Sequence, residues 1–313
     1  MDISLPAKYR DDYPALVRLF ERQIAATPRH AGALTKRLSN AAADHLRMAD
    51  EIAEFVWHIA GADLERVLLD YDWICQLVLG EELHFRRSGN YRLSRFEDAV
   101  AEVYSNDDLM AHYMNGLLIT QVWWSNHTEI MRFFRSAFLR GFTKPFRHLE
   151  IGPGHGLLML LAGRETLCES LEGWDISARS IDHTRRSLDL IGIQRATTLR
   201  VQDLYTAGAT GRTYDSIVLS EILEHLEQPR AALQAVSGLL AEAGRLFVNM
   251  PVNSPAPDHL FLLRTPEDVV DFVADSGYVI EDAKFAPQTN MTLEAARRTQ
   301  STISTAVIAR RRA

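Results

Sequence analysis

The pattern of apolar and polar positions divides the chain into a helical first part and a second part of alternating strands and helices. Over residues 14–111, apolar residues recur three and four positions apart, which is the period of one helix face. Thr27-Pro28-Arg29, Gly80 and the turn Ser88-Gly89-Asn90 interrupt this pattern, and we expect one long helix to end at Gly80. An all-helical segment before an α/β pattern indicates a separate subdomain, over residues 1–108. Its apolar faces need covering, so we expect it to form a lid or a dimerisation surface.

Residues 109–145 form a bridge to the second part and are rich in aromatic side chains. Large apolar side chains at helical spacing are typical of a pair of helices packed in the core. The alternative is that these helices roof a pocket, because mixed aromatic and polar groups suit a flat organic substrate. The candidate substrate contacts are Tyr113, Trp123, Trp124 and His127.

Residues 146–313 read as a domain in which short apolar runs alternate with helical segments, which predicts a mostly parallel sheet with helices on both faces. The expected strands cover residues 147–151, 171–176, 198–203, 215–220, 244–252, 278–285 and 301–310. A helix is expected from Thr265, since Thr is a good N-cap and Pro266 suits the first helical position.

A glycine-rich turn follows the first expected strand. In order, it contains Glu150, Gly152, Pro153, Gly154 and Gly156. A strand, a glycine turn and a helix allow backbone N–H groups to approach a nucleotide-like ligand, since glycine has no Cβ to hold it away. The spacing is not the dinucleotide pattern G-x-G-x-x-G, because position 157 is Leu, and the lysine of a phosphate-binding P-loop is missing.

This turn resembles motif I of the class I S-adenosylmethionine (SAM)-dependent methyltransferases, and the resemblance covers about residues 146–309. In that family the glycine turn lies against the methionine part of SAM, and the acid, here Glu150, lies close beneath it. The resemblance implies a Rossmann-like seven-stranded sheet that ends in a hairpin with an antiparallel last strand. It also implies SAM as the cofactor.

The end of the second expected strand carries Asp175. Ligands of open α/β sheets bind at the carboxyl ends of the strands, so this carboxylate is placed to accept both ribose hydroxyl groups. A helix-capping role is the alternative, but Ser177 already offers a cap. Ile176 would pack on a face of the adenine.

The third and fourth expected strands end in further candidate cofactor residues. In the resembled family, an acid at the position of Asp203 accepts from the adenine amino group, and the next apolar residue, here Leu204, covers the ring. Asp203 could instead be a turn residue. Ser220 ends the fourth strand, where the backbone should line the cofactor near the transferred methyl group.

The stretch after the fourth strand supplies candidate catalytic residues. Glu221 and His225 lie at i and i+4, which places them on one face of a helix. His225 is the most reasonable general base because the ordinary pKa of histidine lies near neutrality, with local hydrogen bonding as the alternative role. His259 and Glu221 are the other candidate acid–base groups.

A metal site is a second interpretation of the same residues. Glu221, Glu224, His225 and His259 are similar to the metal ligands of small-RNA 2′-O-methyltransferases and of some catechol-type O-methyltransferases. Such a set could bind Mg, Mn, Fe or Zn and lower the pKa of a substrate hydroxyl. Leu226 stands where the RNA enzymes carry a second histidine, so no metal ligand is assigned from the sequence.

Composition indicates in which cellular environment the protein works and which classes of partner it binds. A formal charge of −7 over 313 residues argues against a nucleic-acid partner for the whole protein. Cys75 and Cys168 are too few for a disulfide framework, which indicates a reducing interior. The N-terminus lacks a signal-peptide pattern, and no apolar run approaches the ~18 residues of a membrane span. We therefore expect a soluble cytoplasmic protein, and a homodimer through the N-terminal helices.

Together these features predict a SAM-dependent methyltransferase that acts by in-line displacement on a small, aromatic, natural-product-like acceptor, as in secondary metabolism. The methylated atom could be oxygen, nitrogen or carbon. The alternatives are an RNA- or protein-directed methyltransferase, a metal-dependent O-methyltransferase and a non-catalytic SAM-binding scaffold.

Overall fold

The computed structural model describes residue 5 and residues 8–206 and 211–312. The first part of the chain is helical, as predicted. Its helices are α1 (Lys8–Asp12), α2 (Pro14–Ala26), α3 (Ala31–Ser39), α4 (Ala43–Ala60), α5 (Leu64–Ser88), α6 (Phe96–Ala99), α7 (Asp107–Trp123) and α8 (Ser125–Phe133). A π-helical turn over Val100–Tyr104 extends α6, and another over Phe134–Phe138 extends α8.

The prediction that a helix ends at Gly80 is wrong. Helix α5 runs through Gly80 to Ser88 and ends at Gly89, which has a left-handed φ of 74°. A glycine inside an exposed helix costs about 1 kcal/mol, which the packed face of a long helix can absorb. A glycine just after the last turn provides the left-handed conformation that ends the helix.

Within the described residues, seven strands form one sheet in the order β3-β2-β1-β4-β5-β7-β6, which confirms the predicted fold class. The strands are β1 (Phe146–Ile151), β2 (Cys168–Asp175), β3 (Ala196–Val201), β4 (Tyr214–Ser220), β5 (Leu240–Val252), β6 (Tyr278–Pro287) and β7 (Ile303–Arg311). Strands β1 to β5 pair in parallel, whereas β7 pairs antiparallel with both β5 and β6.

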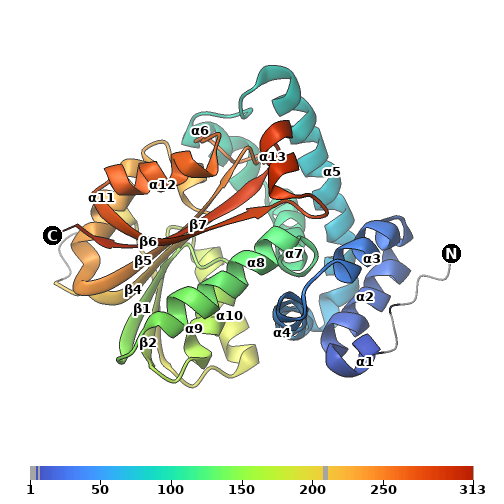
Figure 1. Ribbon diagram of the computed structural model, residues 1–313, viewed down its shortest axis with the longest axis horizontal. Coiled ribbons are helices and arrows are strands. Elements are labelled where there is room, and N and C mark those ends of the chain that lie inside the picture. The colour runs from blue at the N-terminus through green and yellow to red at the C-terminus, as the bar shows by residue number, and fades with distance from the viewer. Residues whose placement is uncertain (1–4, 6–7, 207–210, 313) are drawn as a thin grey trace.

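Helices cover both faces of the sheet (Figure 1). The helices of the second part are α9 (Leu157–Arg164), α10 (Ala178–Ile191), α11 (Pro229–Leu239), α12 (Pro266–Asp275) and α13 (Leu293–Thr299). Helices α8, α9 and α10 lie on one side of the sheet, and α11 and α12 lie on the other. Helix α13, between β6 and β7, was not predicted. Thr265 caps α12 as expected, because its side chain accepts from the N–H of Asp268.

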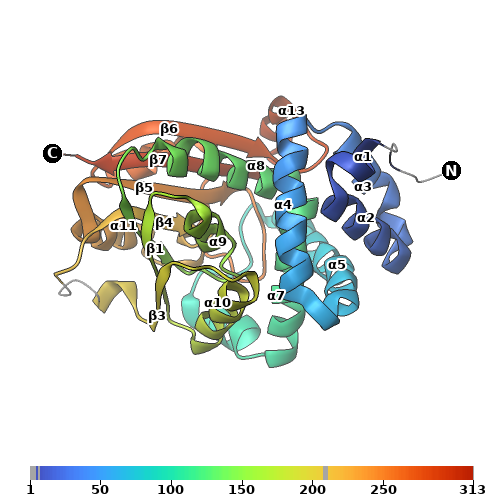
Figure 2. The same cartoon turned by 90° about the horizontal axis from the view of Figure 1, so that it is seen from below.

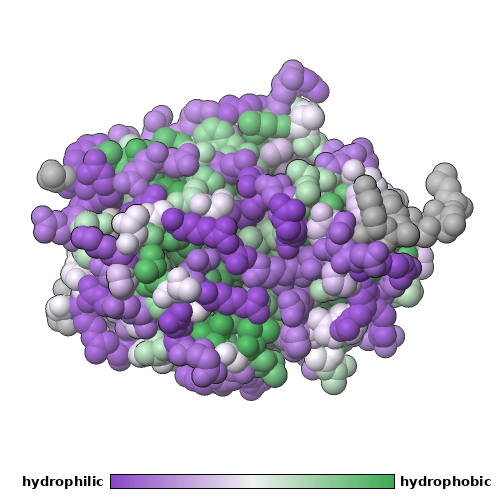
Figure 3. All heavy atoms as spheres, turned by 60° about the horizontal axis from the view of Figure 1, so that its bottom comes forward, coloured by the Kyte–Doolittle hydropathy of each residue, from purple (hydrophilic) through white to green (hydrophobic). Residues whose placement is uncertain are grey.

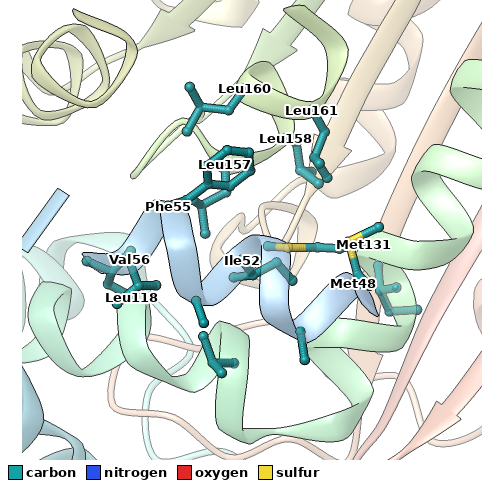
Figure 4. Packing of buried hydrophobic residues seen from close by; sticks show 14 of the residues in the cluster. Met48, Ile52, Phe55, Val56, Leu118, Met131, Leu157, Leu158, Leu160 and Leu161 are labelled. Atoms are coloured by element: carbon teal, nitrogen blue, oxygen red, sulfur yellow. The ribbon is translucent and has the colours of Figure 1, made fainter. Parts of the chain in front are cut away.

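The helical part shares a hydrophobic core with the sheet domain. Helix α4 crosses beside α7, α8 and α10 in Figure 2. Figure 4 shows where its buried face meets the apolar helix that follows the glycine turn. The side chains labelled there are Met48, Ile52, Phe55 and Val56 of α4, Leu118 of α7, Met131 of α8, and Leu157, Leu158, Leu160 and Leu161 of α9. The position of α9, and with it the turn, therefore depends on the first part of the chain.

Trp123 is a core residue. Its side chain is fully buried, and its indole N–H donates a hydrogen bond of 3.0 Å to Oε1 of the buried Gln23 in α2. The Gln23 amide in turn donates to the carbonyl of Leu68 in α5, at 2.9 Å. Trp123 thus joins three helices, and this core position does not favour the substrate contact expected from the sequence, which stays a prediction.

The surface is mostly hydrophilic on the face shown in Figure 3, with apolar side chains exposed in patches among polar ones. Among the described residues, no helix combines the length and the apolar character needed to cross a membrane.

We expect Trp123→Ala to lower the free energy of unfolding by about 3–5 kcal/mol, because it opens a cavity among α2, α5 and α7 and leaves the Gln23 oxygen without its donor. Urea denaturation followed by circular dichroism measures this change. Leu190→Ala is the control: that side chain, on α10, is 58% exposed, so its removal should change stability by less than about 0.5 kcal/mol. Equal effects of the two substitutions would contradict the core assignment.

Candidate active site

The strand order reverses direction between β1 and β4, which lie side by side at the centre of the sheet. Chain connections leave the carboxyl ends of these two strands in opposite directions, and such a switch point is where open α/β sheets bind ligands. The glycine turn follows β1, and Glu221 follows β4. The candidate site therefore lies at this edge of the sheet.

The glycine turn has a backbone that other residues rarely adopt. Gly152, Gly154 and Gly156 have φ values of 66°, 53° and 75°. A Cβ on Gly152 would lie 2.1 Å from Cδ1 of Ile222, whereas a Cβ on Gly154 would meet no heavy atom within 4 Å. Gly154 is thus the point where the backbone is open to a ligand, and Pro153 lies between these two glycines.

Two other elements hold the turn in place. Nε2 of His155 lies 2.8 Å from the carbonyl oxygen of Met114 in α7, and the Thr184 hydroxyl in α10 donates to the carbonyl of Gly154 at 2.8 Å. Burial lowers the pKa of His155 to about 3, so its neutral ring donates to this carbonyl. Helix α7 therefore helps to fix the turn.

Beneath the turn, Glu150 is almost fully buried. Burial raises the pKa of its carboxyl group well above the ordinary value. His148, two residues earlier on β1, is fully buried, and its Nε2 lies 3.9 Å from a Glu150 oxygen. Burial lowers the pKa of His148 to about 3, so its ring is neutral and forms no ion pair with Glu150.

Asp175 ends β2, beside the glycine turn, and its carboxylate engages the start of α10. One oxygen accepts from the N–H of Ser177 at 2.8 Å, and the other accepts from the Ser180 hydroxyl at 2.6 Å. Ser177 caps the helix with its own side chain. Asp175 can therefore support the start of the helix and also bind a ribose, which are the two roles considered from the sequence. A carboxylate has about four acceptor positions, so two can still receive ligand hydroxyl groups. Ile176 is 60% exposed and offers an apolar surface to a planar ring.

Asp203 and Leu204 follow β3 along the same edge of the sheet. Asp203 is exposed, and its carboxylate accepts from the N–H of Tyr205 at 2.9 Å, as a turn residue would. Leu204 is buried, and the exposed apolar side chain at this point is that of its neighbour Tyr205. The expected adenine contacts of Asp203 and Leu204 stay predictions.

The turn after β4 is strained and held by β5. Glu221 has a φ of 55°, which is uncommon for a residue with a Cβ. The Asn249 side-chain amide in β5 donates to the Glu221 carboxylate at 2.8 Å and to the Ser220 hydroxyl at 3.1 Å. Burial raises the pKa of Glu221 to about 7. Strain of this kind is often retained at functional sites, where surrounding contacts hold it.

Three of the residues singled out from the sequence meet here. Glu224, His225 and His259 each place one potential ligand atom within 4.8 Å of the others. The rings of His225 and His259 lie edge to face with centroids 4.8 Å apart. His259 belongs to the loop after β5, which is attached to the β4 turn because the N–H groups of Leu260 and Phe261 donate to the Glu224 carbonyl at 2.8 and 2.9 Å.

A buried acid in this loop, Asp258, was not predicted as a site residue; it is 2% exposed. Its carboxylate accepts hydrogen bonds from the hydroxyl groups of Tyr113 at 2.9 Å and Tyr104 at 3.1 Å, and it lies 3.4 Å from Nδ1 of His225. Burial opposes its ionisation, but the neighbouring imidazole groups and the two tyrosine bonds outweigh burial, so the pKa of Asp258 is lowered. An acid beside a histidine in Pro257-Asp-His was the available signal.

The aromatic bridge is divided between two places. Tyr113 is in the polar cluster with Asp258, whereas Trp124 and His127 lie at the junction of α7 and α8, with their rings tilted by 59° and their centroids 5.1 Å apart. Nδ1 of His127 lies 3.3 Å from the hydroxyl of Thr120, and burial lowers the pKa of His127 to about 4. Of the predicted substrate contacts, Tyr113 is thus the one that joins the catalytic candidates.

Comparison with known proteins identifies a family to which the chain belongs. Residues 110–273, more than half of the chain, match a family model described as a methyltransferase domain. The solved structure of an O-methyltransferase family protein from Burkholderia thailandensis is 14% identical, with a TM-score of 0.51 over 80% of this chain and 72% of that one. At this identity the likeness establishes the fold.

Two further solved structures match less of the chain. The [4+2]-cyclase SpnF is 13% identical, with a TM-score of 0.47 over 60% of this chain and 82% of that one. The N-terminal domain of EvdMO1, solved in the presence of S-adenosylhomocysteine (SAH) and D-fucose, is 16% identical, with a TM-score of 0.43 over 57% of this chain and 81% of that one. No curated protein matches the sequence significantly.

The neutral state of buried His148 predicts a pH dependence of stability. Its pKa is lower in the folded chain than in the unfolded chain, so only the unfolded chain gains a proton as the pH falls below about 6.5. His148→Gln should remove this dependence, so that between pH 6.5 and pH 5 the wild type loses roughly 2 kcal/mol more of its unfolding free energy than the variant does. Urea denaturation at each pH tests this, and parallel losses in both proteins would refute it.

Proposed function

The chain belongs to the methyltransferase family, and we propose that it transfers the methyl group of SAM to a small organic acceptor bound beside the polar cluster after β4. The observation that carries this proposal is the placement of His225, His259 and Asp258 at the carboxyl end of β4, next to the open glycine turn after β1. In-line displacement needs the acceptor atom, the methyl carbon and the sulfur to be aligned, and groups on both sides of the switch point can provide that alignment.

SAM is the cofactor of this family, and the strand ends of the chain suit its parts. The methionine part would lie against the open backbone at Gly154, and the ribose hydroxyl groups would bind Asp175. Ile176 supplies an exposed apolar surface for the adenine, and Asp203 follows the neighbouring strand β3. Ser220 and the backbone of Glu221 would lie near the sulfonium.

His225 is the proposed proton acceptor for the nucleophile. Its Nδ1 faces three acceptors: the Asp258 carbonyl at 3.2 Å, the Asp258 carboxylate at 3.4 Å and the Tyr104 hydroxyl oxygen at 3.4 Å. Nδ1 therefore carries the proton of the neutral ring, and the lone pair is on Nε2. The Asp258 carboxylate beside Nδ1 holds the ring in the orientation in which Nε2 can take a proton. Glu221 and His259 complete the acid–base set.

A small acceptor is favoured over a macromolecule. The site is lined by buried tyrosine and histidine side chains, which suit a partly aromatic molecule. An RNA-directed enzyme would instead need a basic track, and the chain has a formal charge of −7. The buried acid–base cluster at the methyl position also favours an enzyme over a non-catalytic scaffold.

The proposal also includes the localisation, the type of metabolism and the oligomeric state of the protein. A cytoplasmic role in secondary metabolism fits an enzyme with a small aromatic acceptor. A homodimer through the N-terminal helices has support from helix α5, where Leu69, Leu79 and Leu83 are each at least half exposed. Apolar side chains of this size are usually covered when they gather on one element.

The direct test uses SAM labelled on its methyl group and a panel of acceptors: phenols, catechols, indoles, aliphatic alcohols and amines, with an RNA oligonucleotide and a peptide as comparison. The proposal expects label in at least one small acceptor and none in the polymers. Transfer to RNA or peptide alone would replace the proposed acceptor class. Binding of SAH without transfer to any member of the panel would favour the scaffold.

Asp175→Ala should weaken SAH binding about 10- to 100-fold, because the ribose loses hydrogen bonds to a charged group. Isothermal titration calorimetry measures the change. Asp182→Ala is the matched control, since Asp182 is an exposed acid on α10 that pairs with Arg185 at 2.5 Å. Unchanged affinity in the Asp175 variant would remove the ribose assignment.

His225→Ala should reduce turnover about 10²- to 10⁴-fold while SAH binding changes by less than threefold, since a general base acts on the acceptor and not on the cofactor. Single-turnover rates with the acceptor found in the panel give the first quantity, and calorimetry gives the second. Full turnover in this variant would show that another group takes the proton.

A further inference from the structure

Glu224 has a buried side chain whose polar neighbour is another carboxyl group, that of Glu221. Its exposed fraction is 0%, and within the part of the chain that the structure describes neither carboxyl oxygen accepts a hydrogen bond from an N–H group. The backbone carbonyl of the same residue accepts two bonds, from Leu260 and Phe261, so the backbone is fixed while the side chain is left unsatisfied. Buried polar groups without partners are costly and uncommon, and this one indicates a missing ligand.

A second carboxyl group makes the deficit larger. Glu221 is half-buried, and its carboxyl group lies within hydrogen-bonding reach of the Glu224 carboxyl group. The two carboxyl groups can be accommodated together by a shared proton or by a cation. Glu221 has a donor of its own in Asn249, so the unmet demand is at Glu224.

Two imidazole rings converge on the unsatisfied carboxyl group, and both are oriented by acceptors behind them. Nδ1 of His259 lies 2.6 Å from the Ser254 carbonyl, and Nδ1 of His225 lies 3.2 Å from the Asp258 carbonyl. Each Nδ1 therefore donates, which leaves the Nε2 lone pairs available. Metal-binding histidines are typically held in this way by a carbonyl or carboxylate on the second nitrogen.

From this geometry we propose that Glu224, His225 and His259 bind one divalent cation. The three ligand atoms lie within 4.8 Å of one another and come from two loops that are bonded together. Two imidazoles and one carboxylate suit Mn, Fe, Co or Zn, whereas Mg and Ca prefer oxygen ligands. Asp258 and Ser254 serve as positioning residues, because they hold the ligand rings without binding the ion.

This inference rests on the proposed function and makes its acceptor more specific. A cation at this position lowers the pKa of a hydroxyl group that reaches it, so the site selects an oxygen acceptor. The hydroxyl proton passes to the Glu221 carboxylate, the oxygen forms a bond to the methyl carbon, and the carbon–sulfur bond breaks to release SAH. His225 then acts as a ligand rather than as the proton acceptor.

The test is calorimetric titration of the chelator-treated full chain with Mn²⁺ and, separately, with Zn²⁺. The wild type should bind one ion, and Glu224→Gln and His259→Gln should each bind it at least about 100-fold more weakly. Asp258→Asn should weaken binding by about 10- to 100-fold, which is typical for loss of a group behind a ligand. His112→Gln is the matched control, since His112 pairs with Asp70 at 2.6 Å outside the cluster and its loss should leave ion binding unchanged.

The outcomes separate this inference from the proposed function. SAH titrated into each variant shows whether the fold and the cofactor site are intact. No ion binding by the wild type, or equal binding by wild type and Glu224→Gln, would overturn the metal site and leave a shared proton between Glu221 and Glu224. Methyl transfer by the metal-free chain would then still support the proposed function with His225 as base, whereas loss of SAH binding would remove the function itself.

Discussion

Buried polar groups need hydrogen-bond partners, and this requirement connects the helical first part of the chain to the candidate site. Asp258 is a buried carboxylate in the loop after β5, and two of its hydrogen-bond donors, Tyr104 and Tyr113, come from the helical part and the bridge. The same loop is held by the Tyr91 hydroxyl, which accepts from the N–H of Ser254 at 3.1 Å. An ionised carboxylate cannot stay in this position without donors, so the helices are part of the site's construction.

The apolar core also connects the helical first part of the chain to the candidate site. Helix α4 packs on α9, and α9 begins directly after the glycine turn, so the position of the turn depends on contacts some 100 residues earlier in the chain. His155 adds a polar contact from the turn to α7. The sheet supplies the switch point, and the first part of the chain fixes what surrounds it. The long helical segment before the sheet thus has a structural role at the candidate site of this chain.

The sequence was sufficient for the fold because its signals were local. Alternating apolar runs and the Thr265-Pro266 helix start predict the strands of the sheet and the capped helix without reference to distant contacts. Helix α5 shows the limit, since its continuation through Gly80 depends on tertiary packing that outweighs one unfavourable residue. Trp123 shows a second limit of prediction from sequence, because the spacing of an aromatic residue on a helix is the same whether its side chain faces a pocket or the core.

The site was predictable only in part, for the same reason. Glu221, Glu224 and His225 are neighbours in sequence, and His259 stood out by its residue type, so the sequence could nominate them. Asp258 and its tyrosine donors meet across more than 140 residues, and no spacing rule links them. The unsatisfied carboxyl of Glu224 is likewise a property of the folded chain, because it depends on which donors the packing fails to supply.

The measurement that tests the central claim most directly is calorimetric titration of the wild-type chain with SAH. A cofactor site built from the open glycine turn and Asp175 predicts one saturable site per chain, with a dissociation constant in or below the range of about 1–100 μM. Absence of binding at millimolar SAH would contradict the account, because no methyl transfer from SAM could then take place at the switch point of this sheet.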